Sequence, residues 1–354
     1  MHQSEKPKSH TGISKTNRFI TLLAGVSLLC STQVYGWGTW GHTHINKGAI
    51  LALPKEMGMF FYNHADFITE ESTIPDLRKY TINDKAEFPR HYIDLEKYNY
   101  SSPESMPKDM DGAIAKFGKD TINKYGTLPW YIKEMMANLT DAMKNKRKTE
   151  MLFLAADLGH YIADAQMPLH TTVNHDGQSS GQQGIHSFWE AQLPELFGKN
   201  YNLNVGEAEF VADIDKSTWQ FIDSSHKLVY KLLNDEFKMK KDNPLEKQYV
   251  MGADGNPAKN KFKAPVHTYE YAHVYHELMD GMVERQMRRA ILFTADFWYT
   301  AWVNAGKPDL STLDPEYITE RNKTFYKQDL KALEKGKVKG VSADKEFENV
   351  GKIK

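Results

Sequence analysis

Histidine and carboxylate side chains occur at metal-ligand spacing in LGHYIADAQMPLH, residues 158–170. His160 and Asp164 are four residues apart on a predicted helix, so their side chains share one face, one turn apart. His170 follows Pro168, which ends this helix. A single pair of this kind is usually only a hydrogen-bonded contact, so further donors are needed before a metal site is predicted.

A second pair supplies such donors. In GIHSFWE, His186 and Glu190 again stand four residues apart, and a polar segment, 177–184, links them to the first motif. The two pairs and His170 place five nitrogen and oxygen donors within 31 residues. Zinc accepts such donors at about 2.0–2.2 Å. The single cysteine precedes all of these motifs, so nitrogen and oxygen ligands favour water-activating zinc over structural zinc.

Donors nearer the N-terminus extend the set. Trp37 begins WGTWGH, and after leader cleavage its α-amino group and carbonyl oxygen could chelate a metal, with His42 one turn away. PDLRKY contains Asp76, and RHYIDLE contains His91 followed by Asp94. A natural role for Asp94 is to accept a hydrogen bond from the imidazole N–H of the ligand His91.

This order of motifs, from Trp37 to about Glu195, resembles that of the zinc-dependent phospholipase C and S1/P1 nuclease superfamily. The resemblance implies an all-α fold with three clustered zinc ions. Its ligands fall into three groups: Asp76, His91, His160 and Asp164; His170, His186 and Glu190; and Trp37, His42 and Asp164. Asp164 would therefore bridge two ions, and Asp76 would double as the catalytic base that orients the attacking water.

The chemistry expected of such a site is phosphodiester hydrolysis. Zinc brings the pKa of a bound water toward neutrality, and clustered cations hold phosphate oxygens during in-line attack. Arg78 and Lys79 follow Asp76 closely and could approach the phosphate, although a solvated charge at a helix end is the alternative for each. We predict an enzyme, a zinc-dependent phosphoric ester hydrolase.

Two substrate classes remain open at the sequence level. Glu190 and the short interval from His170 to His186 resemble the phospholipases, and a mature chain without cysteine lacks the disulfides of fungal and plant nucleases. WGTWGH has nuclease-like spacing, and Tyr92 could stack on a base. We predict a phospholipase C-like enzyme acting on a phospholipid head group. The alternatives are an S1/P1-type nuclease acting on single-stranded nucleic acid, and a metal-stabilised binder.

Helices must position these residues. Periodic apolar residues predict helices over 43–53, 132–143, 150–165 and 284–305, and one continuous apolar face from Lys216 to Leu233. Alternating runs are few, so an all-α single domain is predicted over 37–310. The Lys-rich extension 311–354 is interpreted as a solvated helix or a disordered end, and 240–265 as a surface excursion. His64 and His267 are expected at the surface.

Composition and the first residues indicate the class of protein and the compartment in which it acts. With 45 basic and 46 acidic residues in 354, the charge balance disfavours a protein that coats nucleic acid, and one cysteine excludes a disulfide framework. Residues 1–36 combine a basic start with the apolar stretch 19–30, which predicts a signal peptide cleaved before Trp37. A lipoprotein anchored at Cys30 is the alternative. We expect an exported protein, periplasmic or secreted, with at most peripheral membrane contact and no stable protein partner.

Overall fold

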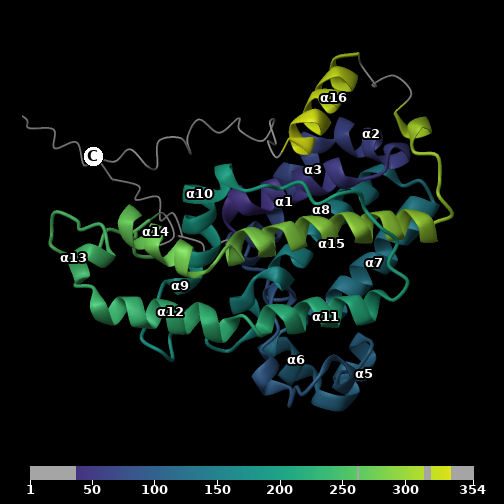
Figure 1. Cartoon of the computed structure of the whole chain (residues 1–354). Helices are drawn as coiled ribbons and strands as arrows, with labels where there is room; N and C mark the ends of the chain where they lie inside the picture. The colour runs from purple at the N-terminus through teal and green to yellow at the C-terminus, as the bar shows by residue number, and fades with distance from the viewer. Residues whose placement is uncertain (1–36, 261–262, 315–319, 336–354) are drawn as a thin grey trace, which may run out of the picture. The chain divides into compact units, whose positions relative to one another are not determined.

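The structure, a computed structural model, describes residues 37–260, 263–314 and 320–335, so the predicted signal peptide lies outside the described residues. The described residues form helices joined by turns, with isolated β-bridges but no strand among them (Figure 1). The predicted all-α class is confirmed. None of the described helices combines the length and the apolar character that a membrane span requires.

The helices before the polar segment at 177–184 are α1 (Gly38–Ala52), α2 (Lys55–Asn63), α3 (Ala65–Glu71), α4 (Ile74–Tyr80), α5 (Met110–Phe117), α6 (Lys119–Tyr125), α7 (Leu128–Lys144) and α8 (Lys148–Gln166). Those after it are α9 (Ile185–Ser187), α10 (Leu193–Phe197), α11 (Ile214–His226), α12 (Val229–Asp242), α13 (Leu245–Gln248), α14 (Tyr269–Leu278), α15 (Met282–Asn304) and α16 (Glu320–Glu334). The short turns important for the site are the 3-10 turns η1 (Phe88–His91) and η4 (Pro168–Thr171) and the π-helical turn η5 (Phe188–Gln192).

The centre of the fold is α8, which packs against α1, α7 and α15 (Figure 1). Its C-terminal half is buried on all sides, as expected of a helix whose apolar residues do not form a single stripe. Gly159 permits the close approach of α1, since a Cβ there would lie 2.1 Å from Oδ1 of Asn46. Asn46 in turn donates to the carbonyl of Ala156 at 3.2 Å. Because His160 follows Gly159 directly, this contact also brings the donor His160 against α1.

The predicted helices at 132–143, 150–165 and 284–305 are confirmed as α7, α8 and α15, and the one at 43–53 begins earlier, at Gly38. The apolar face predicted from Lys216 to Leu233 is divided between two helices, because α11 ends at His226 and α12 begins at Val229. The break allows α11 to pack against α7 and α8 while α12 packs against α14. Periodicity carries across this break, so the pattern alone does not reveal it.

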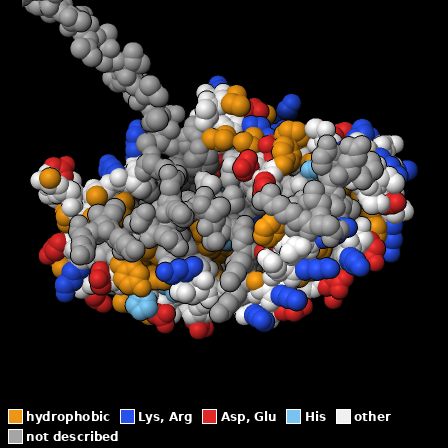
Figure 2. Space-filling model, turned by 90° about the horizontal axis from the view of Figure 1, so that it is seen from above, with side chains coloured by type: hydrophobic (Ala, Val, Ile, Leu, Met, Phe, Trp, Pro, Cys, Tyr) orange, Lys and Arg blue, Asp and Glu red, His pale blue; other side chains and the backbone are white. Residues whose placement is uncertain are grey.

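The C-terminal segment is not simply solvated. Within α16, Tyr326 and Leu333 are buried against Leu51 of α1, and the helix also contacts α2. Residues 336–354 of the predicted extension lie outside the described part of the chain. Figure 2 shows one face of the molecule, on which basic and acidic side chains are interspersed around hydrophobic ones. Among the described residues visible on that face, no broad surface of a single charge appears.

Candidate metal centre

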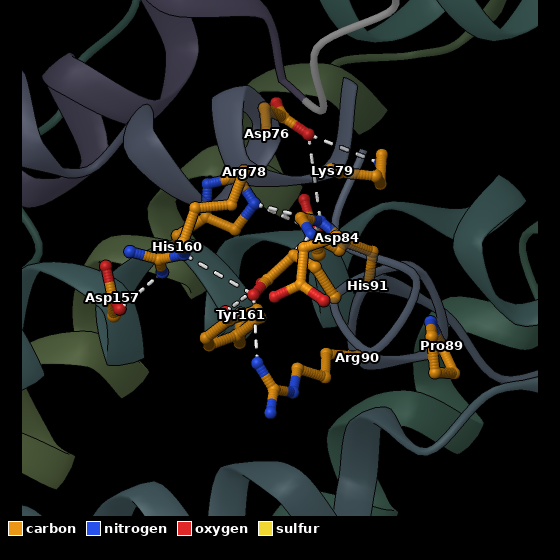
Figure 3. A network of polar contacts seen from close by, with 12 residues as sticks. Asp76, Arg78, Lys79, Asp84, Pro89, Arg90, His91, Asp157, His160 and Tyr161 are labelled. Atoms are coloured by element: carbon orange, nitrogen blue, oxygen red, sulfur yellow. Dashed lines mark hydrogen bonds and ion pairs between the residues drawn. The ribbon is translucent and has the colours of Figure 1, made fainter. Parts of the chain in front are cut away.

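One group of donors surrounds Asp164, near the C-terminal end of α8. Its Oδ2 lies 3.3 Å from Nε2 of His160 and 2.9 Å from Nδ1 of His91. Nε2 of His42 lies 3.6 Å from Asp164 Oδ1, and Asp76 Oδ1 lies 3.7 Å from His91 Nδ1. All five side chains are buried, and Figure 3 shows Asp76, His91 and His160 among the polar contacts around them. Helices α1, α4 and α8 and the turn η1 thus bring together donors 122 residues apart in sequence.

A second group contains His170, His186 and Glu190. The Nε2 atoms of the two histidines lie 3.2 Å apart, and Glu190 lies 2.9 Å from His186 and 3.5 Å from His170. Glu190 is fully buried within the π-helical turn η5, a local irregularity that is frequent at functional sites. Nδ1 of His170 also lies 3.6 Å from Asp164, which places the second group beside the first.

Hydrogen bonds to backbone carbonyls orient three of these imidazoles through Nδ1. Nδ1 of His160 bonds to the carbonyl of Ser72 at 2.8 Å, Nδ1 of His170 to that of His91 at 2.7 Å, and Nδ1 of His186 to that of His175 at 2.9 Å. A carbonyl oxygen can only accept, so each Nδ1 carries the proton and, in the neutral ring, each Nε2 presents a lone pair. In the second group two such nitrogens and a carboxylate face one another. Their lone pairs repel unless a cation lies among them.

Unpaired buried atoms support the same conclusion. Among the described residues, both ring nitrogens of His42 and Oδ1 of Asp164 are buried without a hydrogen-bond partner. Buried polar atoms are nearly always paired, so these atoms fit a ligand role. Three sets of donor atoms lie within 4.8 Å of one another: His42, His160 and Asp164; Asp76, His91 and His160; and His170, His186 and Glu190. These buried clusters could hold metal ions.

The electrostatics of the clusters favour positive charge at His160 and His186 but not at His42. Burial alone would lower the pKa of His160, but the carboxylate of Asp164 outweighs it and raises that pKa to about 9. Glu190 overcomes burial in the same way and raises the pKa of His186 to about 9. Burial and the neighbouring His160 lower the pKa of His42, which keeps this imidazole neutral. Proton and metal ion are alternative carriers of the required charge.

The carboxylate that supports His91 was not recognised from the sequence. Oε1 of Glu87, four residues earlier, lies 3.4 Å from His91 Nε2, whereas Asp94, the expected partner, lines the cavity instead. Glu87 also binds Arg90 at 2.9 Å and accepts a hydrogen bond from Tyr161. Although burial opposes its ionisation, the hydrogen bonds from His91 and Tyr161 lower the pKa of Glu87 to about 2. The four-residue spacing of Glu87 and His91 could have indicated this contact, but Pro89 between them argues against a helical turn in the sequence.

The two basic residues after Asp76 have different surroundings. Arg78 turns to Asp157 and to Oε2 of Glu87, 3.4 Å away, so its charge is occupied within the protein (Figure 3). Lys79 is buried, lines the cavity and lies 3.3 Å from Asp76 Oδ1. Burial opposes its charge, but Asp76 and Tyr80 raise the pKa of Lys79, so the ammonium remains protonated. Of the two, only Lys79 faces the cavity, where it stays paired with Asp76.

Ligand residues of both groups border a cavity of about 1550 Å³. His91, His170 and His186 all contribute to its lining. Aromatic rings line it as well: Tyr80, Phe88, Tyr92 and Tyr125. Further lysines also face it: Lys97, Lys124, Lys259 and Lys263. A cavity of this size admits a small organic phosphate beside the donors.

Trp37, the ninth predicted ligand residue, is also close to the first group. Its indole Nε1 donates to the carbonyl of Ala163 at 2.6 Å, and Ala163 immediately precedes Asp164. Its ring is fully buried, 5.2 Å from that of Trp189. The residues before Trp37 lie outside the described part, so the role of its amine stays a prediction.

The expectation that His267 lies at the surface is wrong. The ring is buried, stacked on Phe188 at a centroid distance of 3.7 Å and on Tyr271 at 5.3 Å. Phe188 lies between His186 and Glu190, so His267 packs against the segment that carries the second group. His64 is half-buried and pairs with Asp314.

No protein-family model matches the chain, and no curated protein matches it either. The interpretation of the site therefore rests on the motifs and on the geometry described above.

Proposed function

We propose that this protein is an exported metal-dependent phosphodiesterase with a phospholipase C/P1 nuclease-like fold. The observation that carries the proposal is the convergence of bare imidazole nitrogens and carboxylates in clusters that border one cavity. We assign one ion to Asp76, His91, His160 and Asp164, a second to His170, His186 and Glu190, and a third to Trp37, His42 and Asp164. Zinc bound there would supply Lewis-acid charge for phosphate oxygens and for activation of water.

The protein's own residues would then orient the substrate and move the proton. The ammonium of Lys79 would bind a non-bridging oxygen of the phosphate, since it faces the cavity and is protonated. A carboxylate oxygen of Asp76 would accept a proton from the attacking water. The new bond forms between the water oxygen and phosphorus as the opposite ester bond breaks, and the leaving oxygen would take up a proton from water in the cavity. The burial of Asp76 keeps bulk water from solvating its carboxylate.

A phospholipid head group is the substrate class that we propose first. The resemblance of the second motif, with Glu190 at its end, supports it, and the cavity is large enough for a head group. The second candidate is single-stranded nucleic acid, and the aromatic lining of the cavity favours it. Tyr92 adjoins the donor His91, and Tyr80 adjoins Lys79, so a base could stack beside the scissile phosphate.

The test measures bound metal and turnover on the same mature protein, beginning at Trp37. We expect about three zinc ions per chain and hydrolysis of bis(4-nitrophenyl) phosphate, with release of diacylglycerol from phosphatidylcholine. Cleavage of single-stranded DNA without lipid hydrolysis would select the second candidate. Zinc without turnover of any of these substrates would refute the enzymatic proposal and leave a metal-stabilised binder.

A further inference from the structure

Residues 249–260 and 263–267 contribute one wall of the cavity, although the sequence suggested only a surface excursion. They pair as a small antiparallel ribbon, which we call the cavity ribbon. Tyr249 bridges to His267, and Lys259 bridges to Pro265. The amide of Val266 donates to Ala258 at 2.9 Å. A hydrogen-bonded ribbon holds its side chains in set positions, unlike a free loop.

The cavity ribbon is attached to the segment that carries His186 and Glu190. The side-chain amide of Gln192 donates to the carbonyl of His267 at 2.8 Å and accepts from its N–H at 3.1 Å. Pro265 packs so closely on Gly184 that a Cβ there would lie 2.8 Å from the proline ring. Together with the stacked ring of His267, these contacts fix the ribbon relative to the second group of donors.

Two lysines of the cavity ribbon, Lys259 and Lys263, line the cavity. Both side chains are exposed, and within the described residues neither forms an ion pair or a cation–π contact. Lys97 and Lys124, in contrast, lie over the ring of Tyr125 at 5.8 and 5.1 Å. The ribbon therefore presents the two uncommitted cations of the cavity lining.

The acidic residues near the ribbon are already engaged. Asp176 Oδ1 accepts the amides of Gly184 at 2.9 Å and His186 at 3.3 Å. Asp254 accepts from the side-chain amide of Asn256 at 3.0 Å. Among the described residues, neither carboxylate forms an ion pair with Lys259 or Lys263, so the charge of the two lysines is available to an anionic ligand.

We propose that the cavity ribbon is the specificity element of this site and that Lys259 and Lys263 bind a second phosphate of the substrate, next to the one held by the metal centre. The inference rests on the proposed function for the position of the first phosphate. Two ammonium groups suit a phosphate that carries up to two negative charges. A polyphosphorylated head group and the neighbouring phosphate of an oligonucleotide both present this chemistry.

Calorimetric titration of the metal-loaded mature protein tests the proposal without requiring turnover. One pair of probes is thymidine 5′-phosphate and thymidine 3′,5′-bisphosphate; the other is inositol 1-phosphate and inositol 1,4-bisphosphate. We expect the bisphosphate of at least one pair to bind about tenfold more tightly than its monophosphate. The pair that shows the preference identifies the source of the second phosphate.

The double variant Lys259→Gln/Lys263→Gln should reduce this preference to about twofold or less, with monophosphate binding unchanged. The matched control is Lys238→Gln/Lys247→Gln, which removes two exposed lysines outside the cavity lining and should retain the preference. No preference in the native protein, a preference retained by the first variant, or equal loss in the control would each overturn the proposal. Failure to hydrolyse bis(4-nitrophenyl) phosphate would instead refute the proposed function alone.

Discussion

The candidate metal centre and the contact between α16 and α1 both bury carboxylates, but different partners balance the negative charge in the two regions. At α16, Asp329 lies 3.4 Å from Nζ of Lys47 and accepts the hydroxyl of Tyr62 at 2.6 Å. At the metal centre, Asp164 faces imidazoles of neighbouring helices and turns. A lysine and a tyrosine satisfy a carboxylate within the protein, whereas converging imidazole lone pairs need a proton or a bound metal ion between them. The first region is complete as a structural contact, and the second fits a binding site.

Removing the shared donors should have the largest effect. His160→Ala and Asp164→Asn should each lower kcat by more than about a thousandfold, because His160 belongs to two donor sets and Asp164 lies between the imidazoles of both groups. Metal analysis should show fewer bound ions in each variant. His273→Ala, at an exposed position outside these sets, is the control. Near-normal rates in either site variant would contradict the assignment.

Blocking the amine of Trp37 should affect the ion shared with His42. A protein that retains Gly36 before Trp37 should lose about one metal ion and about a hundredfold in kcat, because an amide nitrogen is a poor ligand. Mass spectrometry must first establish the N-terminus of both forms. Full activity and full metal content in the extended form would exclude the amine as a ligand.

A comparison of Lys79 with Lys133 tests whether Lys79 binds the substrate or only pairs with a carboxylate. Lys79→Gln should lower kcat/KM by about tenfold to a hundredfold, with partial recovery in Lys79→Arg, because a charged contact to phosphate is lost. Lys133 pairs with Asp215 at 2.7 Å away from the cavity lining, so Lys133→Gln should leave kcat/KM unchanged. Equal effects of the two glutamine variants would contradict a role for Lys79 in substrate binding.

The α16 contact should respond in stability and not in catalysis. Asp329→Asn should lower the free energy of unfolding by about 2 kcal/mol, because Lys47 is left buried without its counter-charge. Urea denaturation measures the change, and kcat should remain within about twofold of the native value. The double variant Lys47→Met/Asp329→Leu should recover most of the lost stability. A large loss of kcat in Asp329→Asn would mean that α16 supports the site.

The smallest expected effect concerns acid stability. Burial, assisted by Lys240, lowers the pKa of His267 to about 3. Because the folded pKa lies below the unfolded value of about 6.5, the contribution of His267 is present above pH 6.5 and is lost as pH falls toward 3. Between pH 7 and 5.5 this loss is about 1 kcal/mol. His267→Phe should remove it in urea denaturation, while exposed His273→Phe should not. An unchanged pH dependence in His267→Phe would contradict this linkage.

The helical class and the pairing of donors within local motifs could be predicted from the sequence. His160 with Asp164 and His186 with Glu190 were predictable because residues four apart in helical backbone lie on the same face. Buried helices such as α8 were predictable because their apolar residues are dense and continuous.

How these motifs come together depends on the packing of elements distant in sequence. The carbonyls of Ser72 and His175 carry no side-chain signature, yet they set the orientation of His160 and His186. Packing against α4 decides that Lys79, and not its neighbour Arg78, faces the cavity. Packing against η5 places the cavity ribbon beside the donors. Helical periodicity is a local property of the chain, whereas a ligand cavity forms between segments distant in sequence, so composition and spacing leave its walls undetermined.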